Sequence, residues 1–112
     1  LDGEGYLYIV DPIKDMYISG GENVYPLEVE DVLHHIPGIV EAAVIGVPDV
    51  KWGEVGRAFI VRRTEDAGDG ATVLRHCEQS LARFKVPKQI RFVESLPHNA
   101  TGKLQKHLLP RD

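Results

Sequence analysis

The chain has 112 residues, of which 43% are hydrophobic and 27% charged, and its formal net charge is −4 at pH 7. This balance is typical of a single globular domain with a buried core. No apolar run approaches the ~18 residues that a membrane-spanning helix needs, and the sequence shows no signal-peptide pattern. The lone Cys77 excludes an internal disulfide framework and suits a reducing compartment, so we expect a cytoplasmic protein without a transmembrane segment.

Charge is distributed unevenly along the chain. Residues 1–82 carry a net charge of −9, whereas residues 83–112 carry seven Lys or Arg against two Asp or Glu, a net of +5. A basic end on an acidic body can attract phosphates, and it can equally be an ordinary solvated face. We do not expect nucleic-acid binding, because the basic segment has only Phe84 and Phe92 as aromatic residues and no recognised binding motif.

The first part of the chain predicts a β-hairpin that leads into a glycine loop. Residues 6–10 alternate as a strand does, and residues 11–14 favour a turn. Residues 16–19 are short, apolar and β-prone, so they are expected to pair with the first strand. The Gly20-Gly21 pair that follows permits positive φ and close approach of a ligand to bare backbone.

The middle of the chain predicts a helix and a pair of strands. The helix begins at Pro26, whose missing N–H is no loss at the first helical position, and Pro37-Gly38 ends it. Residues 39–47 and 55–64 are apolar, β-prone runs that are expected to form a hairpin-like pair. The buried stripe of the helix, at spacing i, i+3, i+4 and i+7, is expected to be Val29, Val32, Leu33 and Ile36.

The last part of the chain predicts a surface loop over residues 64–70, a helix over 73–84 and a strand over 89–93. Residues 96–103 are expected to form a loop before a short helix over 104–109. The order ββαββαβα predicts an α+β fold, an antiparallel sheet with packed helices plus an N-terminal β-hairpin. The apolar face of the longer helix is expected to be Leu74, Cys77, Leu81 and Phe84.

Most of the reactive residue types have structural explanations. His34 and His35 point about 100° apart on a helix, so they do not chelate one metal together, and the other histidines lack zinc spacing. Cys77 lies on the predicted apolar stripe, which indicates a buried structural thiol. The sequence therefore predicts no metal site.

Two motifs together resemble those of a known family. Residues 11–26 read Asp-Pro-Ile-Lys-Asp-Met-Tyr-Ile-Ser-Gly-Gly-Glu-Asn-Val-Tyr-Pro, and residues 96–103 read Leu-Pro-His-Asn-Ala-Thr-Gly-Lys. They closely resemble the opening and final motifs of the small C-terminal domain of the acyl-CoA synthetase, or AMP-binding adenylate-forming ligase, family. That family includes luciferases and the adenylation domains of peptide synthetases. The resemblance runs from Gly5 to about Leu109.

The resemblance gives Lys103 a role in a first half-reaction. Taken alone, Lys103 is a surface lysine, and its surroundings are not a Walker P-loop. In the family the matching lysine enters the active site, where the substrate carboxylate attacks the α-phosphate of ATP to give acyl-AMP and pyrophosphate. Gly102 would let the loop approach the nucleotide closely. The implied cofactors are ATP, with Mg²⁺ bound mainly by a large N-terminal domain, and CoA.

The resemblance also implies a second half-reaction that uses another face of the domain. In the family the small domain rotates and the lysine withdraws. The segment that matches Ser19, Gly20, Gly21 and Glu22 then lines the tunnel for the thiol-bearing pantetheine arm of CoA. The hinge of this rotation matches Lys14, at a turn where large φ/ψ changes are readily absorbed.

The implied contacts with the CoA nucleotide involve Trp52, Phe84 and Lys88, although Trp52 and Phe84 can equally be packing residues. The sequence departs from the family pattern at two nearby positions. Val86 stands where an Arg can be found, which removes one phosphate contact. Pro12 stands where the family usually has an Arg that contacts the adenylate, which affects nucleotide binding and the hinge motion.

The resemblance implies that residues 1–112 are one mobile domain, inactive without the absent N-terminal domain. The enzyme would be an acyl-CoA ligase of the kind found in fatty acid metabolism, whose partners are that N-terminal domain, a small carboxylate, ATP and CoA. Two alternatives remain open. The C-terminal part of a peptide-synthetase-type adenylation domain would load a carrier protein, whereas CoA contacts at Trp52 and Lys88 would favour the ligase. A non-catalytic α+β binding or regulatory module would not need Lys103.

Overall fold

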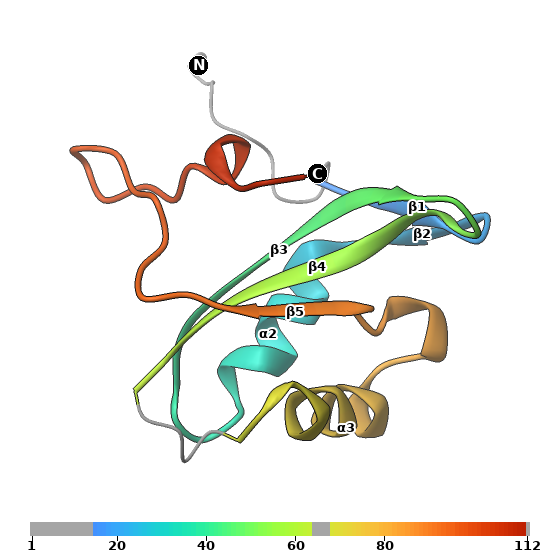
Figure 1. The fold of residues 1–112 in the computed structure, drawn as a ribbon, viewed down its shortest axis with the longest axis horizontal. Helices are drawn as coiled ribbons and strands as arrows, with labels where there is room; N and C mark the ends of the chain where they lie inside the picture. The colour runs from blue at the N-terminus through green and yellow to red at the C-terminus, as the bar shows by residue number, and fades with distance from the viewer. Residues whose placement is uncertain (1–14, 64–67, 112) are drawn as a thin grey trace, which may run out of the picture.

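The computed structural model describes residues 15–63 and 68–111, which form one mixed sheet with helices packed on one of its faces (Figure 1). Both α-helices lie on the same side of the sheet, and the segment after the last strand lies on the other side. The elements are β1 (Tyr17–Ser19), β2 (Glu22–Val24), α2 (Pro26–His34), β3 (Ile39–Asp49), β4 (Gly53–Arg62), α3 (Gly70–Ser80), the 3₁₀ turn η3 (Arg83–Lys85), β5 (Gln89–Phe92) and the 3₁₀ turn η4 (Lys106–Leu108).

The sheet confirms the predicted α+β class. Its strand order is β2-β1-β4-β3, with β5 also paired to β4. The β1–β2, β1–β4 and β3–β4 pairs are antiparallel, whereas β5 runs parallel to β4. The parallel pair follows from the connection, because a strand that returns through a helix such as α3 can lie parallel to the strand it left.

Two clusters of buried side chains fill the two sides of the sheet. Alternate residues of β3 and β4 face opposite sides, as the pleat of a strand requires. Val44 and Ile60 face the helix-covered side, which also contains Val29 and Leu33 of α2. The other side contains these residues of the strands and the C-terminal segment: Ala43, Ile45, Val47, Val55, Phe59, Leu96 and Leu109.

The glycine pair closes a β-hairpin that was not predicted from the sequence. Gly20 has a φ of 58° and Gly21 a φ of 84°, the signs that a two-residue hairpin turn demands. The turn brings β1 and β2 together, with Tyr17 opposite Val24. The strand predicted over 6–10, the turn over 11–14 and their hairpin with residues 16–19 lie outside the described residues.

Helix α2 agrees with its prediction. It begins at Pro26, and Val29, Leu33 and Ile36 are buried while Val32 is partly buried. Its last residue is His34, and His35 caps it through backbone hydrogen bonds, so Ile36 lies just beyond the helix.

The predicted bounds of α3 were wrong at both ends. The helix begins at Gly70 because the side chain of Asp69 accepts a hydrogen bond from the backbone N–H of Thr72, 3.0 Å away. It ends at Ser80 because Leu81 is extended, so Phe84 lies in η3 and not on the helix. Of the predicted loop over 64–70, residues 64–67 lie outside the described ranges.

The predicted helix over 104–109 was also too long. Leu104 pairs with His98 in an isolated antiparallel bridge, which takes the chain out of helical geometry there. Only Lys106–Leu108 form a 3₁₀ turn before Pro110. In the described ranges, no helix is long and apolar enough to cross a membrane.

Side chains bind two backbone groups of β3 on the side away from β4. The carboxylate Oε2 of Glu30 accepts a hydrogen bond from the backbone N–H of Val44 at 2.8 Å. The guanidinium of Arg111 donates to the carbonyl of Gly46 at 2.8 Å. These contacts tie α2 and the C-terminal segment to the same long strand.

Cys77 is buried in the helix-covered cluster, as predicted. Burial raises the pKa of its thiol to about 11, with a smaller contribution from the negative charge of Glu78.

The native Cys77 thiol should therefore react slowly with iodoacetamide at pH 8, and unfolding by denaturant should expose it to fast alkylation. Because the pKa of the thiol is higher in the folded state than in the unfolded chain, this group should lower the free energy of unfolding as pH rises from 9 to 11. Below pH 9 its contribution should not change with pH. A Cys77→Ala variant should lose that part of the pH dependence, and rapid alkylation of the native protein would contradict the prediction.

Candidate functional site

The side chain of Asn99 organises the loop that presents Lys103. Its carbonyl oxygen Oδ1 accepts hydrogen bonds from the backbone N–H of Thr101 at 3.0 Å, the Thr101 hydroxyl at 2.7 Å and the backbone N–H of Lys103 at 2.9 Å. Three donors on one oxygen hold the loop in a single turn, a local use of Asn that is common in loops. The loop therefore has its own internal support.

Backbone geometry closes the same loop. Gly102 has a φ of 88°, a left-handed conformation that glycine adopts without strain. The backbone N–H of Asn99 donates to the carbonyl of Lys103 at 2.9 Å. At the base of the loop, Nε2 of His98 lies 2.7 Å from Oε2 of Glu41 on β3, which joins the loop to the sheet.

Lys103 is exposed at the end of this loop, and no carboxylate in the described residues forms an ion pair with its ammonium group. A free ammonium on a flexible stem above a fixed backbone can reach an incoming anion at small entropic cost to the loop. This arrangement suits electrostatic stabilisation of crowded phosphate and carboxylate charge.

Replacing Asn99 by alanine should loosen the Lys103 loop without unfolding the sheet. The change removes three hydrogen bonds at an exposed site, so we expect a loss of about 1–2 kcal/mol in the free energy of unfolding. The measurement is urea unfolding together with hydrogen exchange at the amides of Thr101 and Lys103. Exchange at those amides should increase, and unchanged exchange would mean that Asn99 does not order the loop.

The glycine loop lies directly against Trp52. The backbone N–H of Gly20 donates to the carbonyl of Trp52 at 2.9 Å, and a Cβ added at Gly20 would lie 2.9 Å from Cε3 of the indole. Nothing lies within 4 Å of a Cβ added at Gly21, so that position faces open space. Ser19 is buried at the end of β1, and Glu22 is exposed at the start of β2. The structure thus brings together the glycine loop and Trp52, which are about thirty residues apart in the sequence.

Two lysine side chains lie close to the ring of Trp52. Asp49 Oδ2 accepts hydrogen bonds from the backbone N–H groups of Lys51 and Trp52, at 3.0 and 2.8 Å, which fixes the turn that presents the indole. The ammonium groups of Lys51 and Lys88 lie 5.1 and 5.2 Å from the centre of the indole ring, within cation–π range. Trp52 itself is 39% exposed, so one part of the ring remains open to a ligand. Phe84, by contrast, is half-buried and packs against the helix-covered cluster.

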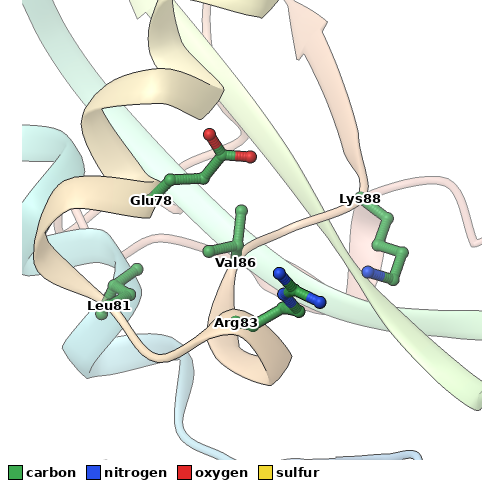
Figure 2. Close-up of a pocket in the computed structure, with 5 residues that line it drawn as sticks. All are labelled: Glu78, Leu81, Arg83, Val86 and Lys88. Atoms are coloured by element: carbon green, nitrogen blue, oxygen red, sulfur yellow. The ribbon is translucent and has the colours of Figure 1, made fainter.

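A hollow of about 380 Å³ lies between the end of α3 and the start of β5 (Figure 2). Lys88 lies at this hollow, and Arg83 in η3 lines it as well, with its guanidinium turned toward Lys88. Val86 also lines it, so the position where the family can carry Arg is apolar here. Arg83 was not among the residues predicted from the sequence, although its place in the basic segment, one residue before Phe84, was a usable signal.

The described residue next to the predicted hinge is bound to the C-terminal segment. Lys14 lies outside the described residues, but the Oδ2 atom of Asp15 lies 2.8 Å from the ammonium of Lys106. Lys106 also pairs with Oε2 of Glu30 at 2.7 Å. Asp15, the residue after the predicted hinge, is therefore joined to the chain just beyond Lys103.

The candidate site residues fall into two groups at opposite ends of the domain. Figure 1 shows the β1–β2 turn at one end of the sheet and the loop between β5 and the C-terminus, coloured orange to red, projecting at the other. Trp52 joins the first group, and Lys103 belongs to the second. Within the described ranges, no group of three or more His, Cys, Asp or Glu could hold a metal ion.

Comparison with known proteins places these features in a family. The family model of the AMP-binding enzyme C-terminal domain matches residues 28–103. The long-chain-fatty-acid–CoA ligase FadD13 of Mycobacterium tuberculosis is 50% identical over 109 residues, 97% of this chain and 22% of that protein. The 3-[(3aS,4S,7aS)-7a-methyl-1,5-dioxo-octahydro-1H-inden-4-yl]propanoyl:CoA ligase of Rhodococcus jostii is 52% identical over 109 residues, 97% of this chain and 21% of that protein.

The fold agrees with the sequence match. A solved Mycobacterium tuberculosis fatty acyl CoA synthetase superposes with a TM-score of 0.82 at 50% identity, over 96% of this chain and 21% of that one. The chain belongs to the AMP-binding enzyme C-terminal domain family. It spans about a fifth of the length of the curated relatives that it matches.

Proposed function

We propose that this chain is the mobile C-terminal domain of an ATP-dependent acyl-CoA ligase. The observation that carries the proposal is the exposed Lys103, which has no ion-pair partner in the described residues and stands on a loop fixed by Asn99. CoA ligation is named for relatives that are about half identical to this chain over nearly its whole length, which supports the same class of reaction here.

Lys103 acts in the first half-reaction, in which a carboxylate attacks the α-phosphate of ATP. The carboxylate–phosphorus bond forms and the bond to the pyrophosphate oxygen breaks, giving acyl-AMP and pyrophosphate. Negative charge crowds around the α-phosphate at this step, and an ammonium group placed there lowers the barrier electrostatically. ATP and its Mg²⁺ bind mainly to the N-terminal domain of the full polypeptide, so the domain described here contributes the lysine and not the metal ligands.

The opposite end of the domain acts in the second half-reaction. After rotation about Lys14, the β1–β2 turn with Ser19, Gly20, Gly21 and Glu22 lines the path of the pantetheine thiol. The thiol sulfur attacks the acyl carbonyl of acyl-AMP and AMP leaves. The exposed indole of Trp52 and the ammonium of Lys88 lie beside this turn, where they can receive the nucleotide half of CoA.

The function is tested on the full-length polypeptide that carries this chain. Carboxylate-dependent exchange of pyrophosphate into ATP reports adenylation, and CoA thioester formation reports the complete reaction. A peptide-synthetase-type protein would show the exchange but acylate a carrier protein in preference to CoA. A polypeptide that exchanges no pyrophosphate with any of a panel of carboxylic acids would be a binding or regulatory module, and the proposal would be wrong.

The two ends of the domain can be tested with a matched pair of glycine variants. Gly21 and Gly102 both have positive φ, 84° and 88°, and a Cβ at either would meet nothing within 4 Å. Alanine should therefore cost similar backbone strain at both, about 1 kcal/mol. We expect Gly21→Ala to slow thioester formation from supplied acyl-AMP about tenfold and to leave pyrophosphate exchange nearly unchanged. The reason is that a displaced tunnel wall would misalign the pantetheine thiol with the acyl carbonyl.

Gly102→Ala is the matched control, with the opposite expectation. It should slow pyrophosphate exchange and leave thioester formation from acyl-AMP nearly unchanged. Equal effects of both variants on both half-reactions would mean that the two ends of the domain are not used separately.

A further inference from the structure

Lys106 joins three segments that are far apart in the sequence. Its ammonium group lies 2.8 Å from Oδ2 of Asp15 and 2.7 Å from Oε2 of Glu30. Asp15 follows the predicted hinge position, Glu30 lies on α2, and Lys106 begins η4, three residues after Lys103. Figure 1 shows the start of β1 and the C-terminal segment side by side, in agreement with the contact between Lys106 and Asp15. One side chain therefore connects the hinge side of the domain with the Lys103 loop and with the helix layer.

The carboxylate of Glu30 is a fixed anchor for this ammonium group. The Glu30 side chain is only 13% exposed, and the same Oε2 atom that contacts Lys106 accepts a hydrogen bond from the backbone N–H of Val44 at 2.8 Å. The anchor is thus held by α2 and by β3 at once. Without the cation, the carboxylates of Asp15 and Glu30 would face the same point and repel each other at a partly buried site, so Asp15 would move away.

The backbone on both sides of Lys106 is held by other contacts. The backbone N–H of Gln105 donates to the carbonyl of Pro97 at 2.9 Å, which closes the base of the Lys103 loop. Leu109 is buried in the cluster on the other side of the sheet, and the guanidinium of Arg57 donates to the carbonyl of Pro110 at 2.8 Å. Lys106 therefore stands on a firm support, from which its side chain reaches the residue after the hinge.

We propose that Lys106 is a positioning residue that makes the domain rotate as one rigid body from Asp15 onward. This inference rests on the proposed ligase function, in which the domain rotates about Lys14. A rotation confined to the hinge carries Lys103 and the glycine turn together, so each end reaches the shared active site in a defined orientation. A loose segment between the hinge and β1 would let the domain dock inaccurately, and a misplacement of about 1 Å can cost about 100-fold in rate.

The test measures both half-reactions on the full-length polypeptide. Lys106→Gln should lower kcat about tenfold both for pyrophosphate exchange and for thioester formation from supplied acyl-AMP, because both depend on where the domain docks. The KM for ATP should be nearly unchanged, since ATP binds mainly to the N-terminal domain. Loss of both half-reactions differs from the effects expected for Lys103→Ala and Gly21→Ala, each of which slows only one.

Two further variants identify the contact that matters. Lys106→Arg should restore most of both rates, because a guanidinium can also bind two carboxylates. Asp15→Ala should reproduce the loss, and combining it with Lys106→Gln should slow the reactions no further than Lys106→Gln alone, because both changes remove the same contact. Normal rates in Asp15→Ala would overturn the proposal.

Lys85→Gln is the matched control. Lys85 pairs with Glu28 of the same helix α2 at 3.0 Å, and its side chain is 26% exposed against 24% for Lys106, so a similar ion pair is lost away from the hinge. Both rates should be kept, and the thermal unfolding midpoint shows whether each variant has folded. Equal losses of rate in Lys85→Gln and Lys106→Gln would overturn the proposal. Loss of pyrophosphate exchange alone in Lys106→Gln would also overturn it, because Lys106 would then support only the Lys103 loop.

Hydrogen exchange over residues 15–19 separates this inference from the proposed function. Exchange in this segment should be faster in Lys106→Gln than in the wild type and unchanged in Lys85→Gln. If the polypeptide forms neither acyl-AMP nor thioester but exchange rises in this way, the ligase function fails and the rigid connection through Lys106 stands. If exchange over residues 15–19 is the same in Lys106→Gln as in the wild type, Lys106 does not hold this segment and the inference fails.

Discussion

Replacing Lys103 by alanine in the full-length polypeptide is expected to slow formation of the acyl-adenylate by about 100- to 1,000-fold. The change removes the ammonium that we propose to act at the α-phosphate, and loss of one preorganised donor at a site of developing charge costs about 3–4 kcal/mol. The loop itself should survive, because Asn99 bonds to the backbone of Lys103 and not to its side chain. Pyrophosphate exchange at saturating carboxylate and ATP measures the effect.

The second half-reaction provides the internal comparison for this variant. Thioester formation from supplied acyl-AMP should be nearly unchanged, since in the proposed mechanism the lysine is withdrawn at that step. Lys85→Ala, which removes another positive charge on the surface, should leave both half-reactions intact. If Lys103→Ala keeps both activities, Lys103 is an ordinary surface lysine. If a folded variant loses both, the lysine has a wider role than the one proposed.

Introducing alanine at Gly56 is expected to destabilise the fold by about 3 kcal/mol. The added Cβ would overlap the hydroxyl oxygen of Tyr17 and would lie 3.3 Å from the Cα of Pro87. Tyr17 is buried between β4 and the neighbouring elements, so its ring cannot move aside freely, and overpacking a dense core carries a cost of this order. Urea unfolding of the wild type and the variant measures the difference.

A second substitution tests the cause of this effect. The Tyr17 hydroxyl is buried and has no hydrogen-bond partner among the described residues, so Tyr17→Phe alone should raise stability by about 1 kcal/mol. In the Gly56→Ala background the same change also removes the overlapping atom, so it should restore more stability than it adds to the wild type. Additive effects would mean that the clash is not with the hydroxyl.

Alkaline pH provides an independent check on Tyr17. Burial, and then the negative charge of Glu54, raise the pKa of its hydroxyl. Because the unfolded chain ionises first, this group should make the folded protein progressively less stable as pH rises above about 10. Tyr17→Phe should lack that contribution.

The sequence predicted the elements whose periodicity extends over several turns or strand residues. Pro26 and the buried Val29 and Leu33 identified α2, and the long apolar runs identified the β3–β4 pair. The hairpin of β1 and β2 was missed because three-residue strands are too short to show alternation. Alternation also says nothing about direction, so the parallel pairing of β5 could not be predicted from residues 89–93.

The candidate site was predictable only where its signal is local. Lys103 and the glycine pair stand in recognisable motifs. In the structure Asn99 fixes the loop of the first motif, and the β1–β2 hairpin holds the second. The contact between Gly20 and Trp52 joins distant parts of the chain through the sheet, so no sequence pattern reveals it. The convergence of Arg83 with Lys88 depends on the 3₁₀ turn that follows α3, and the predicted helix over 73–84 placed Arg83 on a different element.

The contacts of Glu30 and Arg111 with β3 have a consequence for how the protein behaves at high concentration. β3 is the longest strand and the last in the sheet order, so a row of its backbone donors and acceptors faces away from its partner. Such a row is a template on which a strand of another molecule can add, and aggregation often starts there. The carboxylate on Val44 and the guanidinium on Gly46 occupy that template from two different segments. Because these two contacts occupy backbone groups near the middle of β3, the longest strand is a poorer template for pairing with a neighbouring copy.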